Sequence, residues 1–239
     1  IYTLYVNNIS SFVTESYDLD TAGDEYFSAP VLSSVTIVFT DEAGVILTNT
    51  GDIAPGNSKK IFMKVTPDRY TIARDVDIYV RVKSSATGAK DVKYERLTIT
   101  PYREIVLTLT PGTEVVIPGQ KVGYYLNIAN KGNISEAGGN LSPLYFQKTE
   151  SQIGWTSEVY WDANGNNTYD SSDGLISVPF ASVINPGLSE DRFLAVEAPL
   201  LAQKDDINIT SLTGSSPDKD GVALIINTVQ VSTTVTTEA

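Results

Sequence analysis

The chain has 239 residues, of which 29 are acidic and 17 are Lys or Arg, so its formal net charge is −12. This charge argues against binding to nucleic-acid phosphates or to anionic membrane surfaces. The sequence contains neither Cys nor His, which excludes thiol nucleophiles, Ser-His-Asp triads, imidazole or thiolate metal centres and disulfide bonds. No apolar run approaches the ~20 residues of a membrane-spanning helix, and the length suits two domains of ordinary size.

Short stretches of alternating apolar and polar residues run along the whole chain, at 35–39, 77–82, 96–99, 104–109 and 227–231. Such period-two runs, rich in Val, Ile, Thr and Tyr, indicate half-buried strands. Pro-Gly pairs lie between them, and this pair forms turns. No segment has the pattern and caps of a helix. The sequence therefore predicts an all-β fold of the sandwich type.

An internal repeat organises the chain. Segment 4–8 matches 126–130, and segment 38–41 matches 159–162. Three later matches follow in the same order: 53–56 with 184–187, 77–78 with 206–207, and 97–99 with 229–231. Because one set of strands recurs, the sequence predicts two copies of one sandwich. We assign residues 1–100 to the first, 101–231 to the second, and 232–239 to a tail or the start of a further repeat.

The first copy is expected to be incomplete. In the second copy a strand pair, 105–109 and 114–117, precedes the matching segment that begins at Leu126. In the first copy only three residues precede Leu4. The first sandwich should therefore lack its N-terminal strand or strands, which an upstream piece or another chain could supply by strand addition.

The second copy contains an insertion that the first does not have. The offset between matching residues grows from 121 before this insertion to 131 after it, whereas the first copy has only a tight turn at 41–44. The inserted loop runs from residue 162 to residue 173. Since the first copy is expected to fold without it, the loop invites a functional explanation.

Calcium binding supplies that explanation. Oxygen-bearing residues occupy loop positions one, three, five, seven, nine and twelve, the ligand spacing of an EF-hand loop. The candidate ligands are Asp162, Asn164, Asn166, the main-chain carbonyl of Thr168, Asp170 and Asp173. Position six is Asn167 in place of the usual Gly, and Asn tolerates positive φ. We expect a Ca²⁺ dissociation constant on the order of 10⁻⁴ to 10⁻³ M. The alternative is a solvated polar turn.

The chain resembles the immunoglobulin-like repeats of prokaryotic cell-surface proteins, which occur in surface-layer subunits, adhesins and stalk proteins. Segments 122–133, 154–173 and 184–187 carry this resemblance. It implies two tandem immunoglobulin-like β-sandwiches and an extracellular, cell-surface location. It also implies a structural role in a surface layer, filament or stalk, with self-association or contacts to neighbouring surface-protein domains. We expect no enzymatic activity, because the acidic residues sit in turns and the whole domain is repeated.

A second hypothesis is an adhesin or carbohydrate-binding module that presents an aromatic-flanked loop to a ligand. Trp155, Tyr160 and Trp161 could stack on a sugar, although Tyr160 aligns with Phe39, which favours a core or sheet position common to both copies. Glycosylation is also left open. Five Asn-x-Ser/Thr sequons occur, at Asn8, Asn133, Asn140, Asn166 and Asn208.

Overall fold

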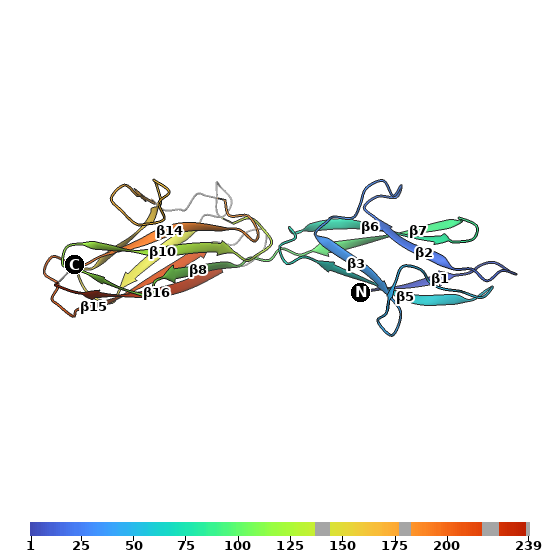
Figure 1. Cartoon of the computed structure of the whole chain (residues 1–239), viewed down its shortest axis with the longest axis horizontal. Helices are drawn as coiled ribbons and strands as arrows, with labels where there is room; N and C mark the ends of the chain where they lie inside the picture. Colours follow the sequence, from blue (N-terminus) through green and yellow to red (C-terminus); the bar gives the residue numbers. More distant parts are fainter. Residues whose placement is uncertain (137–143, 177–182, 217–224, 238–239) are drawn as a thin grey trace. The chain divides into compact units, whose positions relative to one another are not determined.

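The computed structural model describes residues 1–136, 144–176, 183–216 and 225–237. All regular elements among these residues are β-strands, which confirms the predicted fold class. The chain divides into two compact units, Ile1–Thr100 and Pro101–Ala239 (Figure 1). Each unit is an immunoglobulin-like sandwich of two sheets.

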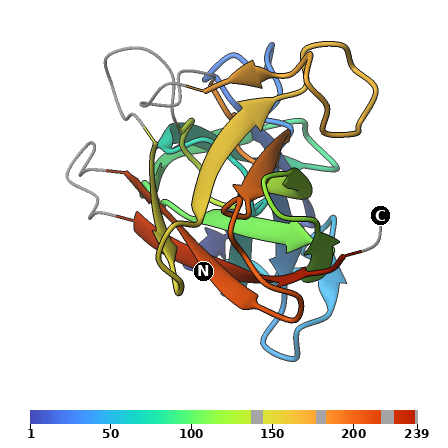
Figure 2. The ribbon, with the colours of Figure 1, turned by 90° about the vertical axis from the view of Figure 1, so that its left-hand side faces the viewer.

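The second unit contains nine described strands. They are β8 (Ile105–Thr110), β9 (Thr113–Val116), β10 (Lys121–Asn130), β11 (Tyr145–Glu150), β12 (Thr156–Trp161), β13 (Gly174–Leu175), β14 (Ser189–Glu197), β15 (Ile207–Ser216) and β16 (Ile225–Val235). One sheet has the order β13-β12-β14-β10-β8 and the other the order β11-β15-β16-β9 (Figure 2, green to red). Strand β16 runs to Val235, so residues 232–235, which the sequence assigned to a tail, belong to this sandwich.

The segment β8–β9 contributes one strand to each sheet. Strand β8 pairs antiparallel with β10, and β9 pairs with β16 in a parallel ladder. Between the sheets, alternate apolar side chains form the core of the unit, and Tyr124, Leu126 and Leu212 are fully buried there. Burying one such aliphatic side chain stabilises the fold by about 1.5–3 kcal/mol.

The first unit has seven strands. They are β1 (Tyr2–Asn7), β2 (Tyr17–Ala22), β3 (Val35–Thr40), β4 (Ile46–Leu47), β5 (Ser58–Pro67), β6 (Arg74–Ser84) and β7 (Lys90–Ile99). Their sheets have the orders β1-β5-β3-β4 and β2-β6-β7. In the first sheet β1, β5, β3 and β4 occupy the places of β10, β14, β12 and β13. In the second sheet β2, β6 and β7 occupy the places of β11, β15 and β16. Strands β8 and β9 have no counterpart among residues 1–100, as the internal repeat predicted for this part of the chain.

The strand registers correct one sequence alignment. Phe62 and Phe193 hold the same place in their sheets, and they pair with Thr40 and Tyr160 respectively. Tyr160 therefore corresponds to Thr40 and not to Phe39. A shift of one residue moves a side chain to the opposite face of a sheet. Tyr160 does lie in a strand of the sheet, one of the two positions predicted for it, but not in the core, because its ring lies on the outer face, against Tyr169.

A second alignment was wrong for the same reason. The match of 77–78 with 206–207 equates Ile78 with Ile207. Ile78 is fully buried, whereas Ile207 is 52% exposed. Their side chains therefore lie on different faces, and only strand pairing, which the sequence does not contain, fixes which residues correspond.

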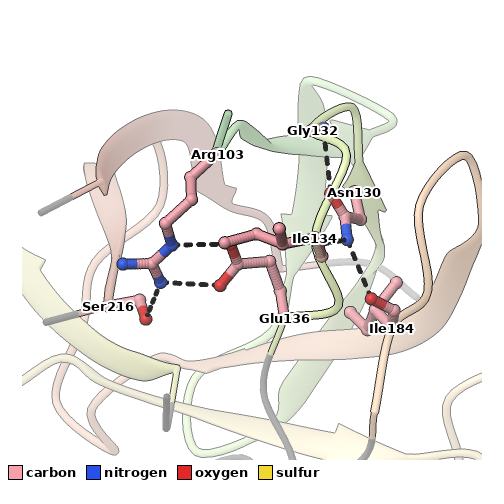
Figure 3. A network of polar contacts seen from close by, with 7 residues as sticks. All are labelled: Arg103, Asn130, Gly132, Ile134, Glu136, Ile184 and Ser216. Carbon is pink, nitrogen blue, oxygen red and sulfur yellow. Dashed lines mark hydrogen bonds and ion pairs between the residues drawn. The ribbon is translucent and has the colours of Figure 1, made fainter. Parts of the chain in front are cut away.

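Both sandwiches form the same asparagine turn after their matching strands β1 and β10. Asn130 donates to the carbonyls of Ile134 and Ile184, each at 2.8 Å, and accepts the Gly132 N–H at 2.9 Å (Figure 3). In the first unit Asn8 makes the equivalent bonds, with Ser10 in the place of the glycine. The turn's geometry requires only an N–H at the third position, which Ser10 supplies as well as Gly132 does.

Candidate functional site

The loop from 162 to 173 joins β12 to β13 and stands out from the second sandwich (Figures 1 and 2, orange-yellow). Gly165 has φ of 72° and Asn167 has φ of 57°. Asn167 therefore takes the left-handed conformation that the sixth loop position was expected to need, and Asn is one of the few non-glycine residues that adopts it readily.

Asp162 closes the first half of the loop. Its carboxylate accepts backbone N–H groups from Gly165 at 2.7 Å, from Asn166 at 3.2 Å and from Asn167 at 2.8 Å. Short polar side chains commonly organise turns through such local bonds to the backbone. The loop is thereby wrapped around its first acidic residue.

Asp170 gathers the middle of the loop. Its carboxylate accepts hydrogen bonds from the side-chain amides of Asn164 and Asn166, at 2.9 and 2.8 Å, and from the backbone and hydroxyl of Ser172. The Ser172 hydroxyl, the Ser172 N–H and the two amides together lower the pKa of Asp170 to about 2. Three of the predicted ligands therefore lie side by side, and the carboxylate among them is ionised at neutral pH.

The remaining predicted ligands lie nearby without completing a cage. Asp173 accepts the Ala163 and Asp170 N–H groups, and the Thr168 N–H donates to Asn166. In the part of the chain that the structure describes, no three acidic side chains converge as a metal site. The donor set of carboxylate, amide and carbonyl oxygens suits a hard cation. To ligate one, Asn164 and Asn166 would have to turn their amide oxygens toward it.

Tyr169 anchors the loop to the sheet, and sequence reasoning missed this residue. Its ring centroid lies 5.1 Å from that of Tyr160 and 6.3 Å from that of Phe193, both in edge-on geometry. Burial, followed by the proximity of Tyr160, raises the pKa of Tyr169 to about 12. The one sequence signal for this contact is an aromatic residue at loop position eight of an otherwise polar loop.

The tryptophans that could hold a sugar are not equivalent. Trp155 is only 6% exposed and belongs to the core of the second unit, so it cannot stack on a ligand. Tyr160 packs on Tyr169 and accepts a hydrogen bond from Lys121 at 3.2 Å. Trp161 is 48% exposed and is the only one of the two tryptophans available to a ligand.

Most of the sequons are buried. Asn8, Asn133 and Asn208 are almost completely inaccessible. The Asn8 amide nitrogen, to which a glycan would be attached, donates to two backbone carbonyls. Glycosylation of the folded chain is therefore excluded at these three residues. Asn166 is exposed, and Asn140 lies outside the described residues.

A buried ion pair fixes the segment that leads into β8 (Figure 3). Arg103 donates to both carboxylate oxygens of Glu136 at 2.6 Å and to the Ser216 hydroxyl at 2.6 Å. The two charged side chains are almost completely buried. Because the pair is bidentate and fully bonded, it is a structural clamp between the start of the unit and the end of β15.

Among the described residues there is no helix of the length and hydropathy that crossing a membrane requires. No protein-family model and no curated protein matches the chain. The solved structures that resemble it include surface-layer, fimbrial and immunoglobulin-type domains.

The chain is similar to domains 4 and 5 of the S-layer protein SbsC, at 16% identity over 98% of both chains, with a TM-score of 0.32. A protein of unknown function from Porphyromonas gingivalis W83 matches at 16% identity over 97% of this chain and 89% of that chain, with a TM-score of 0.30. A chain from the chaperone–tip adhesin complex of CFA/I fimbriae biogenesis matches at 11% identity over 95% and 91%, with a TM-score of 0.28. Likenesses at these TM-scores do not identify a function.

Proposed function

We propose that the chain is a structural component of a prokaryotic cell-surface assembly, such as a surface layer, filament or stalk, built from calcium-stiffened immunoglobulin-like repeats. The repetition of one sandwich carries this proposal, because seven strands recur in the same sheet order in both units. A chain that repeats its whole fold and has neither Cys nor His is suited to be a building block rather than an enzyme.

Calcium would act on the loop from 162 to 173. The ion would be held by the side chains of Asp162, Asn164, Asn166, Asp170 and Asp173 and by the carbonyl of Thr168. It would neutralise the carboxylate charges and give the ligand oxygens a common centre. Tyr169 already fastens the loop to the outer face of the sheet. An ion bound there would stiffen the half of the loop that projects and give it one shape for contact with a neighbouring domain.

Self-assembly is the property that tests the structural role. The purified chain is examined by analytical ultracentrifugation and electron microscopy, without calcium and with calcium at about ten times the expected dissociation constant of ~10⁻⁴ to 10⁻³ M. We expect ordered, calcium-dependent association. A monodisperse chain at high concentration under these conditions would remove the support for the assembly.

The second candidate is an adhesin or carbohydrate-binding module, and the exposed Trp161 beside the loop favours it. A glycan array with the wild-type chain and with Trp161→Ala separates the two functions. Sugar binding that is lost in Trp161→Ala supports the adhesin. If neither the wild-type chain nor the variant binds a sugar, the structural role remains the proposed function.

A further inference from the structure

The connection from β2 to β3 in the first unit is longer than the sandwich requires. It contains twelve residues, 23–34, whereas the matching connection from β11 to β12 in the second unit contains five, 151–155 (Figure 1, blue). Val31 and Leu32 pack against the core of the first unit, so the last part of the connection has a structural role. Its first part, residues 23–29, is extra relative to the second unit and needs another explanation.

This first part is a loop closed around one carboxylate. The Gly23 N–H donates to the carbonyl of Ala29 at 2.9 Å, which joins the two ends of the loop. The Asp24 carboxylate accepts the backbone N–H of Tyr26 at 2.9 Å. It also accepts the N–H groups of Ser28 and Ala29, at 3.0 and 2.6 Å, and the Ser28 hydroxyl at 2.8 Å. The loop therefore presents Tyr26 from a fixed backbone.

Phe27 fastens the loop to the outer face of the sheet β2-β6-β7. Its φ is 56°, a left-handed conformation that is strained for a bulky side chain. The guanidinium carbon of Arg81 lies 4.0 Å from the centroid of the Phe27 ring, and Arg81 pairs with Asp20 at 2.5 Å. Backbone strain of this kind persists only where the surrounding structure holds it, and it is concentrated at functional sites such as ligand-binding loops.

A cavity of about 490 Å³ opens between this loop and β7. Three of its five lining residues are tyrosines: Tyr26 from the loop, Tyr79 from β6 and Tyr94 from β7. Glu25 and Val92 complete the lining. Tyr79 and Tyr94 lie opposite each other in the strand pairing, with ring centroids 5.2 Å apart. Since Tyr26 is 80% exposed and Tyr94 is 45% exposed, aromatic surface is available to a ligand from both the loop and the sheet.

Hydrogen bonds hold two of these rings in place. The Tyr94 hydroxyl donates to Asp77 at 2.8 Å, and Arg96 donates to the same carboxylate oxygen at 2.9 Å. The Tyr26 hydroxyl donates to the neighbouring Glu25, and this bond raises the pKa of Tyr26. Because the rings are already positioned, a ligand would immobilise few side chains on binding, which lowers the entropic cost.

The matching face of the second unit has a different composition. Strands β15 and β16 take the places of β6 and β7, and their outward-facing residues alternate with buried ones. The outward-facing residues that the structure describes there are neither aromatic nor charged: Ile207, Ile209, Ser211, Thr213 and Ser215 in β15, and Thr228, Gln230, Ser232 and Thr234 in β16. The tyrosines of the first unit are therefore not a requirement of the fold that the two units share.

We propose that this cavity binds a neutral oligosaccharide, whose sugar rings pack against Tyr26, Tyr79 and Tyr94. The C–H groups of a sugar ring carry a partial positive charge, and they pack favourably on the negative face of an aromatic ring. Sugar hydroxyls both donate and accept, so they can donate to the Glu25 carboxylate and accept from the Arg96 guanidinium beside Tyr94. The cavity volume lies within the ~300–1,000 Å³ of typical small-ligand sites.

Charge and enclosure separate a neutral oligosaccharide from two other ligands. An acidic glycan is disfavoured, because Glu25 lies in the wall and Arg96 is already paired with Asp77. A quaternary ammonium group binds where aromatic rings surround it, whereas the rings of Tyr26 and Tyr94 remain open to solvent. The inference rests on neither the calcium loop nor the exposed tryptophan, both of which belong to the second unit.

An array of neutral, sulfated and sialylated oligosaccharides tests the proposal on the full chain, with choline as the ammonium probe. We expect saturable binding of neutral oligosaccharides, and isothermal titration calorimetry with a bound member of the array gives its affinity. Tyr94→Ala and Tyr26→Ala should each weaken binding about tenfold, the effect of losing one packed ring. Tyr94→Phe keeps the ring and should keep most of the affinity. Circular dichroism shows whether each variant is folded.

Tyr145→Ala is the matched control, since Tyr145 is 44% exposed in the corresponding sheet of the second unit. This variant and Trp161→Ala should bind as the wild-type chain does. The proposal is overturned if no neutral oligosaccharide binds, if acidic glycans or choline bind in preference, or if folded Tyr94→Ala and Tyr26→Ala bind normally. Loss of binding in Trp161→Ala would also overturn it. Calcium-dependent assembly is measured without sugar, so this site and the proposed function can fail separately.

Discussion

Tyr169 packs directly on Gly123: a Cβ at Gly123 would lie 2.2 Å from the Cβ of Tyr169. The contact joins the middle of the projecting loop to the outer face of β10. Gly123 lies in a strand and is not among the glycines with positive φ. The contact therefore depends on the small size of glycine and not on its conformational freedom. The loop and the strand therefore form one packing unit.

Gly123→Ala is expected to destabilise the second unit by about 1–3 kcal/mol, because the added methyl displaces the Tyr169 ring. The free energy of unfolding in urea measures the effect, with tyrosine fluorescence as a probe of the loop. Gly112→Ala is the matched control, because its Cβ would meet open space. If both variants have the same free energy of unfolding, the packing of Tyr169 does not require a glycine at position 123.

Asp162→Ala is expected to abolish calcium uptake by the loop, since this carboxylate is both the first of the proposed ligands and the organiser of three backbone N–H groups. Isothermal titration calorimetry measures the uptake. Asp41→Ala is the control, because Asp41 organises the short turn of the first unit in a similar way. Unchanged uptake by Asp162→Ala would remove the calcium assignment.

The pH dependence of the loop follows from Asp170. Its pKa is depressed in the folded chain, to about 2, below the usual value of about 3.9. The stabilisation that its ionised form contributes is therefore fully present above about pH 4 and is lost as the pH falls through about 2. An NMR titration of the carboxyl carbon gives this midpoint directly.

Ser172→Ala removes the largest cause of that shift and should raise the midpoint of Asp170 toward 3.9. Asp52→Ala is a suitable control elsewhere on the surface, and it should leave the midpoint unchanged. A midpoint near 4 in the wild-type chain would contradict the hydrogen-bonded geometry.

Breaking the buried pair from one side should be costly. Arg103→Met leaves Glu136 buried without its cation, and we expect a loss of about 3–5 kcal/mol in the free energy of unfolding. The double replacement Arg103→Met with Glu136→Leu should recover most of that loss, because no buried charge remains. Urea unfolding of both variants decides this, and a double variant as unstable as the single one would contradict it.

The sequence predicted the β class and the absence of a β8–β9 counterpart from residues 1–100, because both depend on periodicity and on order along the chain. It did not predict which residues face inward. Phe39 was matched with Tyr160, and the correct partner differs by one residue, which a short apolar run cannot reveal. Strand pairing resolves the difference because it adds a second, independent register.

For the loop, spacing predicted which side chains could gather, and Asn164, Asn166 and Asp170 do lie together. Spacing did not predict that backbone N–H groups would bind the carboxylates of Asp162 and Asp173. It also missed Tyr169, because that contact joins segments far apart in the chain. Local patterns identify candidate ligands, whereas tertiary contacts decide how the loop is held.

The parallel ladder between β9 and β16 has a mechanical consequence for the second unit. These strands lie close to the two ends of the unit and run in the same direction. Tension applied between the start of β9 and the end of β16 pulls these two strands in opposite directions along their length, so the ladder's hydrogen bonds are sheared together rather than broken one after another. The second sandwich is thereby arranged to resist stretching through its own backbone.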